Sequence, residues 1–146
     1  MKNLSVIFML TCYAILSPEV YSMEWKKTNL IVNEIEHKRG GDICVYIFLE
    51  EGFPIKHEKA LKQFCFNATS TTMQTNIQTP DKSFAIKIHH DEDSSGAVTK
   101  NWTGFIPAEG LGFSSGAKLG FGPPSFDDAV ITLPHDGNIE ITIIYP

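Results

Sequence analysis

Alternation of apolar side chains along short segments constrains this chain most, because a side-chain period of two is typical of β-strands. In the clearest segment, residues 43–49 (ICVYIFL), both sets of alternate positions are apolar. A strand of that kind has to be covered on both of its faces. Residues 43–49 are therefore expected to form a central strand of a sheet.

Six further segments have the composition of strands, and they are residues 30–35, 64–68, 71–79, 84–89, 130–133 and 139–145. Residues 84–89 alternate in the manner of a half-buried strand. Asp136-Gly137 supplies the tight turn of a hairpin between the last two segments, and residues 57–63 look like a short helix. The pattern predicts an all-β fold, an immunoglobulin-like or transthyretin-like β-sandwich of about seven strands.

The stretch from Asp91 to Asp128 is too long for an ordinary connection and is rich in glycine and proline. Disordered segments are poor in aromatic and aliphatic residues, whereas this stretch contains Trp102, Phe105, Ile106, Leu111, Phe113, Phe121 and Phe126. We therefore expect one long ordered loop that folds back over the sandwich and is held by its own apolar side chains.

The first 22 residues have the pattern of a secretory signal peptide. Lys2 precedes the apolar run of residues 4–16, and the small residues Val20 and Ser22 end the segment. The run is well short of the roughly 20 residues that a membrane-spanning helix needs. We expect residues 1–22 to be removed and residues 23–146 to form a single domain, periplasmic or extracellular, without a transmembrane segment.

The charge of the chain excludes one class of partner. Its 17 acidic residues outnumber 12 Lys and Arg, for a net charge of −5, and the basic residues form no cluster. Nucleic-acid binding depends on basic side chains that neutralise phosphates. We therefore expect no nucleic-acid partner.

Two cysteines, Cys44 and Cys65, remain after the predicted cleavage. An even pair in an exported chain is most simply a disulfide bond, and two buried free thiols are the alternative. Neither cysteine belongs to a CxxC pair or has histidines at zinc-finger spacing, so a redox-active pair and a zinc site are not indicated.

The long loop begins with oxygen-bearing side chains at alternate positions. Asp91, Asp93 and Ser95 precede Gly96, which is how a calcium loop of the EF-hand type begins. The Ala97 carbonyl and the Thr99 hydroxyl would continue the series, but Trp102 stands where the bidentate acid is required. Glu109 could supply a further oxygen. Calcium is thus the one cofactor that the sequence suggests. The alternative is a turn closed by hydrogen bonds from side chains to the backbone, without a metal.

Two patterns suggest an enzyme, and both are weak. Residues 112–116 match the GxSxG nucleophile motif at Ser114, but the strand, helix and α/β sheet that the motif requires are not predicted around it. His90, Asp91 and Glu109 are a candidate acid/base set. We assign no catalytic residue.

Three segments together resemble a known family: residues 84–91 (FAIKIHHD), 107–114 (PAEGLGFS) and 122–129 (GPPSFDDA). In this order they are similar to the motifs of the secreted bacterial family known as domain of unknown function 2141, and the resemblance covers residues 28 to 145. It implies an exported β-sandwich and brings no established activity, substrate or catalytic residue. The departures fall mainly within residues 93–99, where the family has more amide and carboxylate side chains.

The sequence as a whole favours a non-enzymatic binding or scaffold module in which residues 91–95 organise the long loop, either as a metal-free turn or around calcium. Its partner would be an envelope component or an extracellular ligand of unknown kind. The competing hypothesis is a small hydrolase or acid/base enzyme that uses Ser114, or His90 with Asp91 and Glu109.

Overall fold

The computed structural model describes residues 22–146. The predicted signal peptide therefore lies outside the described residues, apart from its last position, Ser22. The described residues contain seven strands in two sheets, three 3-10 turns and one short helix. Among them, no helix is both long enough and apolar enough to span a membrane.

The two sheets have different widths. The three-stranded sheet has the order β4-β1-β7 and consists of β1 (Trp25–Asn33), β4 (Met73–Pro80) and β7 (Asn138–Thr142). The four-stranded sheet has the order β3-β2-β5-β6 and consists of β2 (Asp42–Phe48), β3 (Lys62–Asn67), β5 (Ala85–Asp91) and β6 (Leu111–Phe113). The helical elements are η1 (His37–Arg39), η2 (His57–Lys59), η3 (Ser114–Gly116) and α1 (Phe126–Ala129).

The main core lies between the two sheets, as the predicted β-sandwich requires. Leu30 of β1 and Ile141 of β7 belong to the same buried cluster as Val45 of β2 and Ile88 of β5. Each of these side chains is almost completely removed from water. The alternation of inward-facing apolar residues along strands of both sheets therefore produces the fold.

The strand order distinguishes between the two predicted types of sandwich. An immunoglobulin domain joins its first, second, fourth and fifth strands in one sheet. Here β1 pairs with β4 in antiparallel fashion and with β7 in parallel fashion, whereas β2 and β5 belong to the other sheet. The transthyretin-like alternative is the one that remains.

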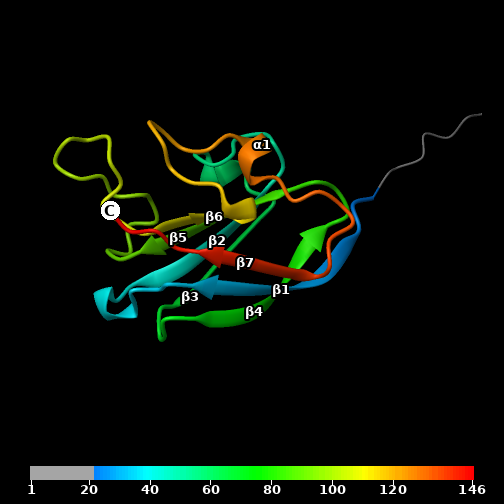
Figure 1. Cartoon of the computed structure of the whole chain (residues 1–146), viewed down its shortest axis with the longest axis horizontal. Helices are drawn as coiled ribbons and strands as arrows, with labels where there is room; N and C mark the ends of the chain where they lie inside the picture. The colour runs from blue at the N-terminus through cyan, green and yellow to red at the C-terminus, as the bar shows by residue number, and fades with distance from the viewer. Residues whose placement is uncertain (1–21) are drawn as a thin grey trace, which may run out of the picture.

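A third layer covers the outer face of the four-stranded sheet. Figure 1 shows α1 and the 3-10 turn η2 on this side of the molecule, away from β1, β4 and β7. The layer comes from residues 49–61 and from the parts of residues 92–130 on either side of β6. Within it, Phe53 packs against two buried clusters, one around Phe48 of β2 and one around Phe113 of β6.

This layer corrects the prediction that residues 84–89 form a half-buried strand. Every residue of β5 is buried, including the outward-facing Lys87 and His89. The alternation in the sequence was correct, but the polar face is covered by segments that are distant along the chain. A single strand's pattern does not reveal such a cover.

The predicted hairpin at residues 130–145 is wrong. Residues 130–133 form only an isolated bridge, Ile131 to Phe84, and β7 pairs with β1. Gly137 does adopt the positive φ of a turn, at 84°. The chain nevertheless crosses there from one sheet to the other, because a turn sequence does not specify which strand becomes the partner.

Two smaller predictions need correction. Residues 57–63 do not form a helix of two turns, because η2 has three residues and β3 starts at Lys62. The long loop is not free of regular structure, since it contains the strand β6 and leads into α1. A three-residue strand such as β6 is too short to show periodicity.

The predicted disulfide bond joins Cys44 of β2 to Cys65 of β3. The two residues are directly opposite each other in the antiparallel register, with their Cα atoms 4.1 Å apart. The bond therefore closes the segment of residues 49–61, which forms part of the third layer.

Candidate ligand-binding site

A cavity of about 650 Å³ lies between the outer face of the four-stranded sheet and the third layer. Its floor includes Lys87 of β5 and Phe113 of β6, which are register partners and therefore project from the same face of the sheet. Pro54 and His57 line one side, and Val98 lines another. Cavities of this size are typical of sites for small organic molecules.

The polar group at the floor of the cavity is Lys87. Its residue is only 4% exposed, and its ammonium donates hydrogen bonds to the Pro54 carbonyl at 3.1 Å and to Nε2 of His57 at 2.7 Å. Burial lowers the pKa of Lys87 to about 8, because removal from water disfavours the charged form. Lys87 still carries a positive charge over most of the neutral range.

His57 is held in a single protonation state. It stacks on the ring of Tyr46, with the two ring centroids 4.0 Å apart. Burial lowers the pKa of His57 to about 4, and the charges of Lys87 and His89 act in the same direction. Because a lysine ammonium can only donate, Nε2 of His57 has to accept, and the imidazole is neutral.

No carboxylate balances the charge of Lys87 among the described residues. None of the ion pairs there involves Lys87, and no residue that lines the cavity is acidic. A second lysine, Lys100, also lines the cavity. In a protein with a net charge of −5, the cavity is a local site of positive charge with an apolar lining.

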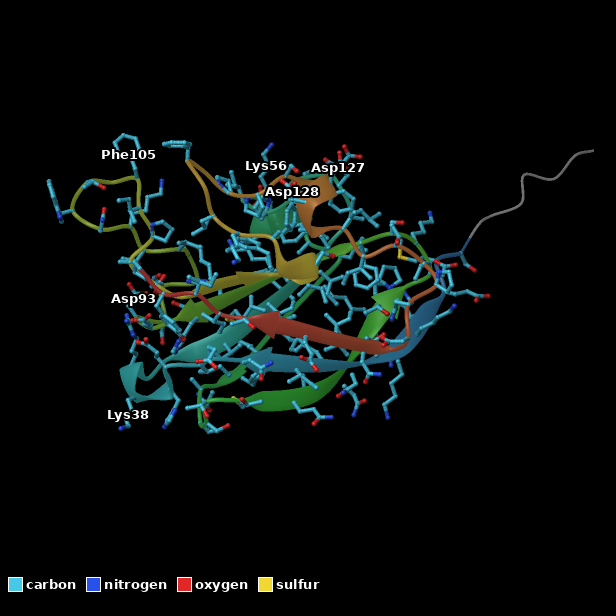
Figure 2. The ribbon with its side chains drawn as sticks, viewed as in Figure 1. Lys38, Lys56, Asp93, Phe105, Asp127 and Asp128 are labelled. Atoms are coloured by element: carbon cyan, nitrogen blue, oxygen red, sulfur yellow. A yellow bond between two sulfur atoms is a disulfide. The ribbon has the colours of Figure 1, made fainter. Side chains whose placement is uncertain are left out.

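Large apolar side chains surround the mouth of the cavity and are left in water. Phe105 is 86% exposed and Phe121 is fully exposed, although both line the cavity, as do Ile55, Ile106 and Leu119. Figure 2 shows Phe105 at the tip of its loop, pointing away from the sheets. Exposed apolar side chains grouped in this way are typical of interaction sites.

These exposures correct only part of the prediction that the long loop is held by its own apolar side chains. Leu111 and Phe113 are buried as expected, and Val98, Ala117 and Phe126 pack against their cluster. The segment around Trp102 and Phe105 is ordered instead by hydrogen bonds, such as those from Asn101 N to Ile106 O and from Ala108 N to Thr99 O. Trp102, at 95% exposure, contributes nothing to its packing.

A buried carboxylate, Glu109, fastens this loop to the sheet. Its Oε2 is 2.7 Å from Nε2 of His89 and accepts the backbone N–H of Thr99, while Oε1 accepts the N–H of Glu92. Charged acceptors form the stronger class of hydrogen bond. Nδ1 of His89 has no partner among the described residues. Glu109 therefore fixes one wall of the cavity relative to β5.

The residues predicted to bind calcium form a compact turn at the end of β5, where Figure 2 labels Asp93. Asp91 and Asp93 both accept the backbone N–H of Ser95 at 3.0 Å, and Asp91 also accepts that of Gly96. The Ser95 hydroxyl donates to the Ala97 carbonyl, and that of Thr99 donates to Asp93. These are the hydrogen bonds of the metal-free alternative.

The predicted calcium residues from separate segments also come together. One nitrogen of His89 and one oxygen each of Asp91 and Glu109 lie within 4.8 Å of one another. Calcium prefers oxygen donors over imidazole. The two carboxylates are thus the part of this cluster that matches the predicted donor set.

Ser114 is placed as a structural residue. It is completely buried, and its hydroxyl donates to the Ala129 carbonyl and accepts the N–H of Ile86 at 2.9 Å. Among the described residues, no histidine is hydrogen-bonded to it. The hydroxyl therefore links α1 and β5 and has no base to activate it.

The acid/base set His90, Asp91 and Glu109 is not assembled as predicted. His90 accepts from the Tyr145 hydroxyl at 2.6 Å and donates to the Gly40 carbonyl at 2.6 Å. The residue beside Asp91 and Glu109 is instead His89. Adjacent residues of β5 point to opposite faces, so His89 and His90 cannot both face the cavity.

The sequence interpretation missed the two hydrogen-bonded polar residues of the cavity, Lys87 on its floor and His57 on its side. Lys87 looked like an ordinary outward residue of an alternating strand, and His57 belonged to a segment interpreted as a helix. The sequence did contain one signal for the cavity, because the long loop has more apolar residues than a surface connection needs.

The sequence of the chain matches one family model over residues 31–142, described as "Uncharacterized protein conserved in bacteria (DUF2141)". The match runs from within β1 to the end of β7 and includes all four strands of the sheet beneath the cavity. No similar protein was found among curated proteins, and none was found among solved structures.

Proposed function

We propose that this chain, which belongs to the DUF2141 family of uncharacterised bacterial proteins, is an exported protein that binds a small, largely apolar molecule. The observation that carries the proposal is the cavity of about 650 Å³ over the four-stranded sheet, with Phe105 and Phe121 exposed at its mouth. Transfer of such side chains out of water on binding is favourable, at roughly 25 cal/mol per Å².

The order of the cavity's walls supports binding rather than a structural role alone. Glu109 fixes the loop of residues 92–110, and the disulfide bond of Cys44 and Cys65 closes the segment of residues 49–61. A cavity with fixed walls loses little entropy when a ligand enters. The exposed apolar rim would otherwise be a liability for solubility.

The hydrolase alternative has less support. Ser114 is buried with both of its hydrogen-bonding roles satisfied by backbone groups. Among the described residues, Lys87 and His57 of the cavity lining are hydrogen-bonded to each other rather than to a nucleophilic hydroxyl. Binding without a chemical step is therefore the function that we propose.

Export is supported by the disulfide bond and by the signal-like pattern of residues 1–22. Stable disulfides are typical of the periplasm and of secreted proteins, because the cytosol keeps thiols reduced. The proposed ligand would accordingly be met in the cell envelope or outside the cell.

A second proposal is that calcium stabilises the loop at the end of β5. Asp91 and Asp93 share the N–H of Ser95, and Asp91 is buried close to Glu109. Neither aspartate has a basic partner in any of the ion pairs of the described residues. A hard cation with oxygen preference would offset the repulsion among these carboxylates.

Binding of a neutral, apolar fluorescent dye, N-phenyl-1-naphthylamine, to the purified protein tests the main proposal. Saturable binding at one site per chain is the expected result, with blue-shifted emission from a dye removed from water. Absence of saturable binding across the soluble range of the dye would overturn the proposal. A heat-unfolded sample of the same chain is the control for non-specific binding of the dye.

A further inference from the structure

We propose that the ligand of this cavity is an amphiphile with one anionic head group, a carboxylate on an apolar body, and that Lys87 binds the head group. This inference rests on the proposed function, since it concerns the ligand class of the same cavity. The juxtaposition that carries it is a buried cation without an acidic partner on the floor of an otherwise apolar cavity.

The first step of the argument is the cost of burying Lys87. A lysine is almost never fully buried unless an opposite charge accompanies it, because the charged form loses its hydration. Lys87 is 4% exposed, and its two hydrogen-bond acceptors, the Pro54 carbonyl and the His57 imidazole, are both neutral. An ammonium has three donors, so one donor remains beyond these two bonds.

The second step is the distribution of charge around the cavity. The lining contains Lys87 and Lys100 and no Asp or Glu. His57 is neutral and therefore does not balance the charge of Lys87. An incoming carboxylate would therefore meet only positive or neutral groups, whereas an incoming cation would meet two lysines.

The third step is the shape of the remaining surface. Phe113, the register partner of Lys87, and Leu111 also line the cavity, and Phe105 and Phe121 stand at the mouth. A carboxylate at Lys87 would thus have an apolar path between floor and mouth for the rest of the molecule. A small hydrophilic anion would leave this surface uncovered, so the geometry favours an amphiphile.

Competition against the bound dye tests the inference on the unmodified protein, with dodecanoate, dodecanol and dodecyltrimethylammonium as matched competitors. The expected result is that dodecanoate displaces the dye at a concentration at least about tenfold lower than dodecanol, because a charge-assisted hydrogen bond is available only to the carboxylate. The cationic competitor should be the weakest of the three. Equal potency of dodecanoate and dodecanol would overturn the inference and leave the proposed function standing.

The variant Lys87→Met assigns the effect to the buried ammonium, and Lys27→Met, at an exposed lysine of β1 in the opposite sheet, is the control. The preference for dodecanoate over dodecanol should disappear in Lys87→Met and persist in Lys27→Met. Lys87→Gln gives the same readout if the methionine variant does not fold. Retention of the preference in a folded Lys87 variant would overturn the assignment. If neither competitor nor the dye binds the native protein, it is the proposed function that fails.

Discussion

Nζ of Lys87 lies 2.7 Å from Nε2 of His57, and this contact joins the floor of the cavity to its covering layer. Lys87 belongs to β5 and His57 to η2, residues that are 30 positions apart in the chain. The contact fixes the imidazole as an acceptor and directs the ammonium along the floor of the cavity. The ammonium of Lys87 is therefore buried and held in one orientation, and no carboxylate of the cavity lining balances its charge.

The stability of the protein should depend on pH through Lys87. The pKa of Lys87 is about 8 in the folded protein, against 10.5 for an ordinary lysine, which stands for the unfolded chain. Burial of the charged side chain therefore lowers the free energy of unfolding. This penalty is complete below about pH 8 and disappears above about pH 10.5, where the side chain is neutral in both states. The free energy of unfolding of the native protein, relative to Lys87→Met, should rise by roughly 3 kcal/mol across this interval. Urea unfolding at several pH values measures the difference.

The groups that face Lys87 make this profile specific. They are His57 from η2, Tyr46 from β2 and His89 on the same strand, with no carboxylate among the lining residues. The pKa of Tyr46 is raised, chiefly by burial, so its phenol ionises at a higher pH than an ordinary tyrosine does. A difference between native protein and variant that does not change with pH would contradict the burial of a charged Lys87.

The exposed rim should affect binding without affecting folding. Replacement of Phe105 and Phe121 by serine should weaken dye binding by about tenfold or more, since each phenylalanine offers a large apolar surface. The free energy of unfolding should change by less than about 0.5 kcal/mol, as is usual for exposed positions. Dye titration and thermal melting measure the two quantities.

Trp102→Ser is the matched control for the rim, because Trp102 is equally exposed on the same loop and does not line the cavity. It should leave dye affinity unchanged. If Trp102→Ser weakened binding as much as the double phenylalanine variant, the dye would be bound by the loop surface rather than by the cavity.

Removal of the disulfide should loosen one wall of the cavity. The bond closes a loop between residues 21 positions apart, which the chain-entropy relation equates with about 3 kcal/mol of stability. The variant Cys44→Ser with Cys65→Ser should lose roughly this amount in chemical unfolding. Unchanged stability would mean that the bridge does not constrain the chain.

Calcium should raise the melting temperature of the native protein. A ligand present at a hundredfold excess over its dissociation constant adds about 2.7 kcal/mol, which corresponds to a shift of several degrees for a domain of this size. Asp93→Asn should reduce the shift, because it removes one of the carboxylates of the turn. Identical melting curves with calcium and with a chelator would refute the calcium proposal and leave the cavity unaffected.

The pKa of Asp93 is lowered by hydrogen bonds within the turn, without any bound ion. Hydrogen bonds from Thr99 and then Ser95 lower it to about 2. Because this folded value lies below the ordinary 3.8, the stabilisation from these bonds is present above about pH 4 and is lost as the pH falls towards 2. The turn therefore remains formed at neutral pH in the absence of calcium.

The sequence predicted the features of the fold that have a local signature, such as a strand or a pair of cysteines. The two apolar faces of residues 43–49 correctly indicated the central strand β2, and the cysteine count predicted the bridge that links β2 to β3. The parallel pairing of β7 with β1 could not be predicted, because it joins the two ends of the domain and has no local signature.

The cavity escaped prediction for a related reason. Lys87 is buried because two segments cover it, residues 49–61, which precede it in the chain, and the long loop, which follows it. Its alternation with Ile86 and Ile88 is that of any solvent-facing lysine. Of the apolar residues that suggested a self-packed loop, Leu111 and Phe113 are buried, whereas Trp102, Phe105 and Phe121 are exposed. Backbone hydrogen bonds and Glu109 order the segment around the exposed ones.

Nuclear magnetic resonance spectra of the labelled protein, recorded during titration with dodecanoate, show whether the cavity over the outer face of the four-stranded sheet is the binding site. The largest shifts should fall on Lys87, Val98, Phe105, Phe113 and Phe121, while the opposite sheet, β4-β1-β7, stays unperturbed. Shifts that fall mainly on the opposite sheet, or no shifts at all at saturating dodecanoate, would contradict binding in the cavity.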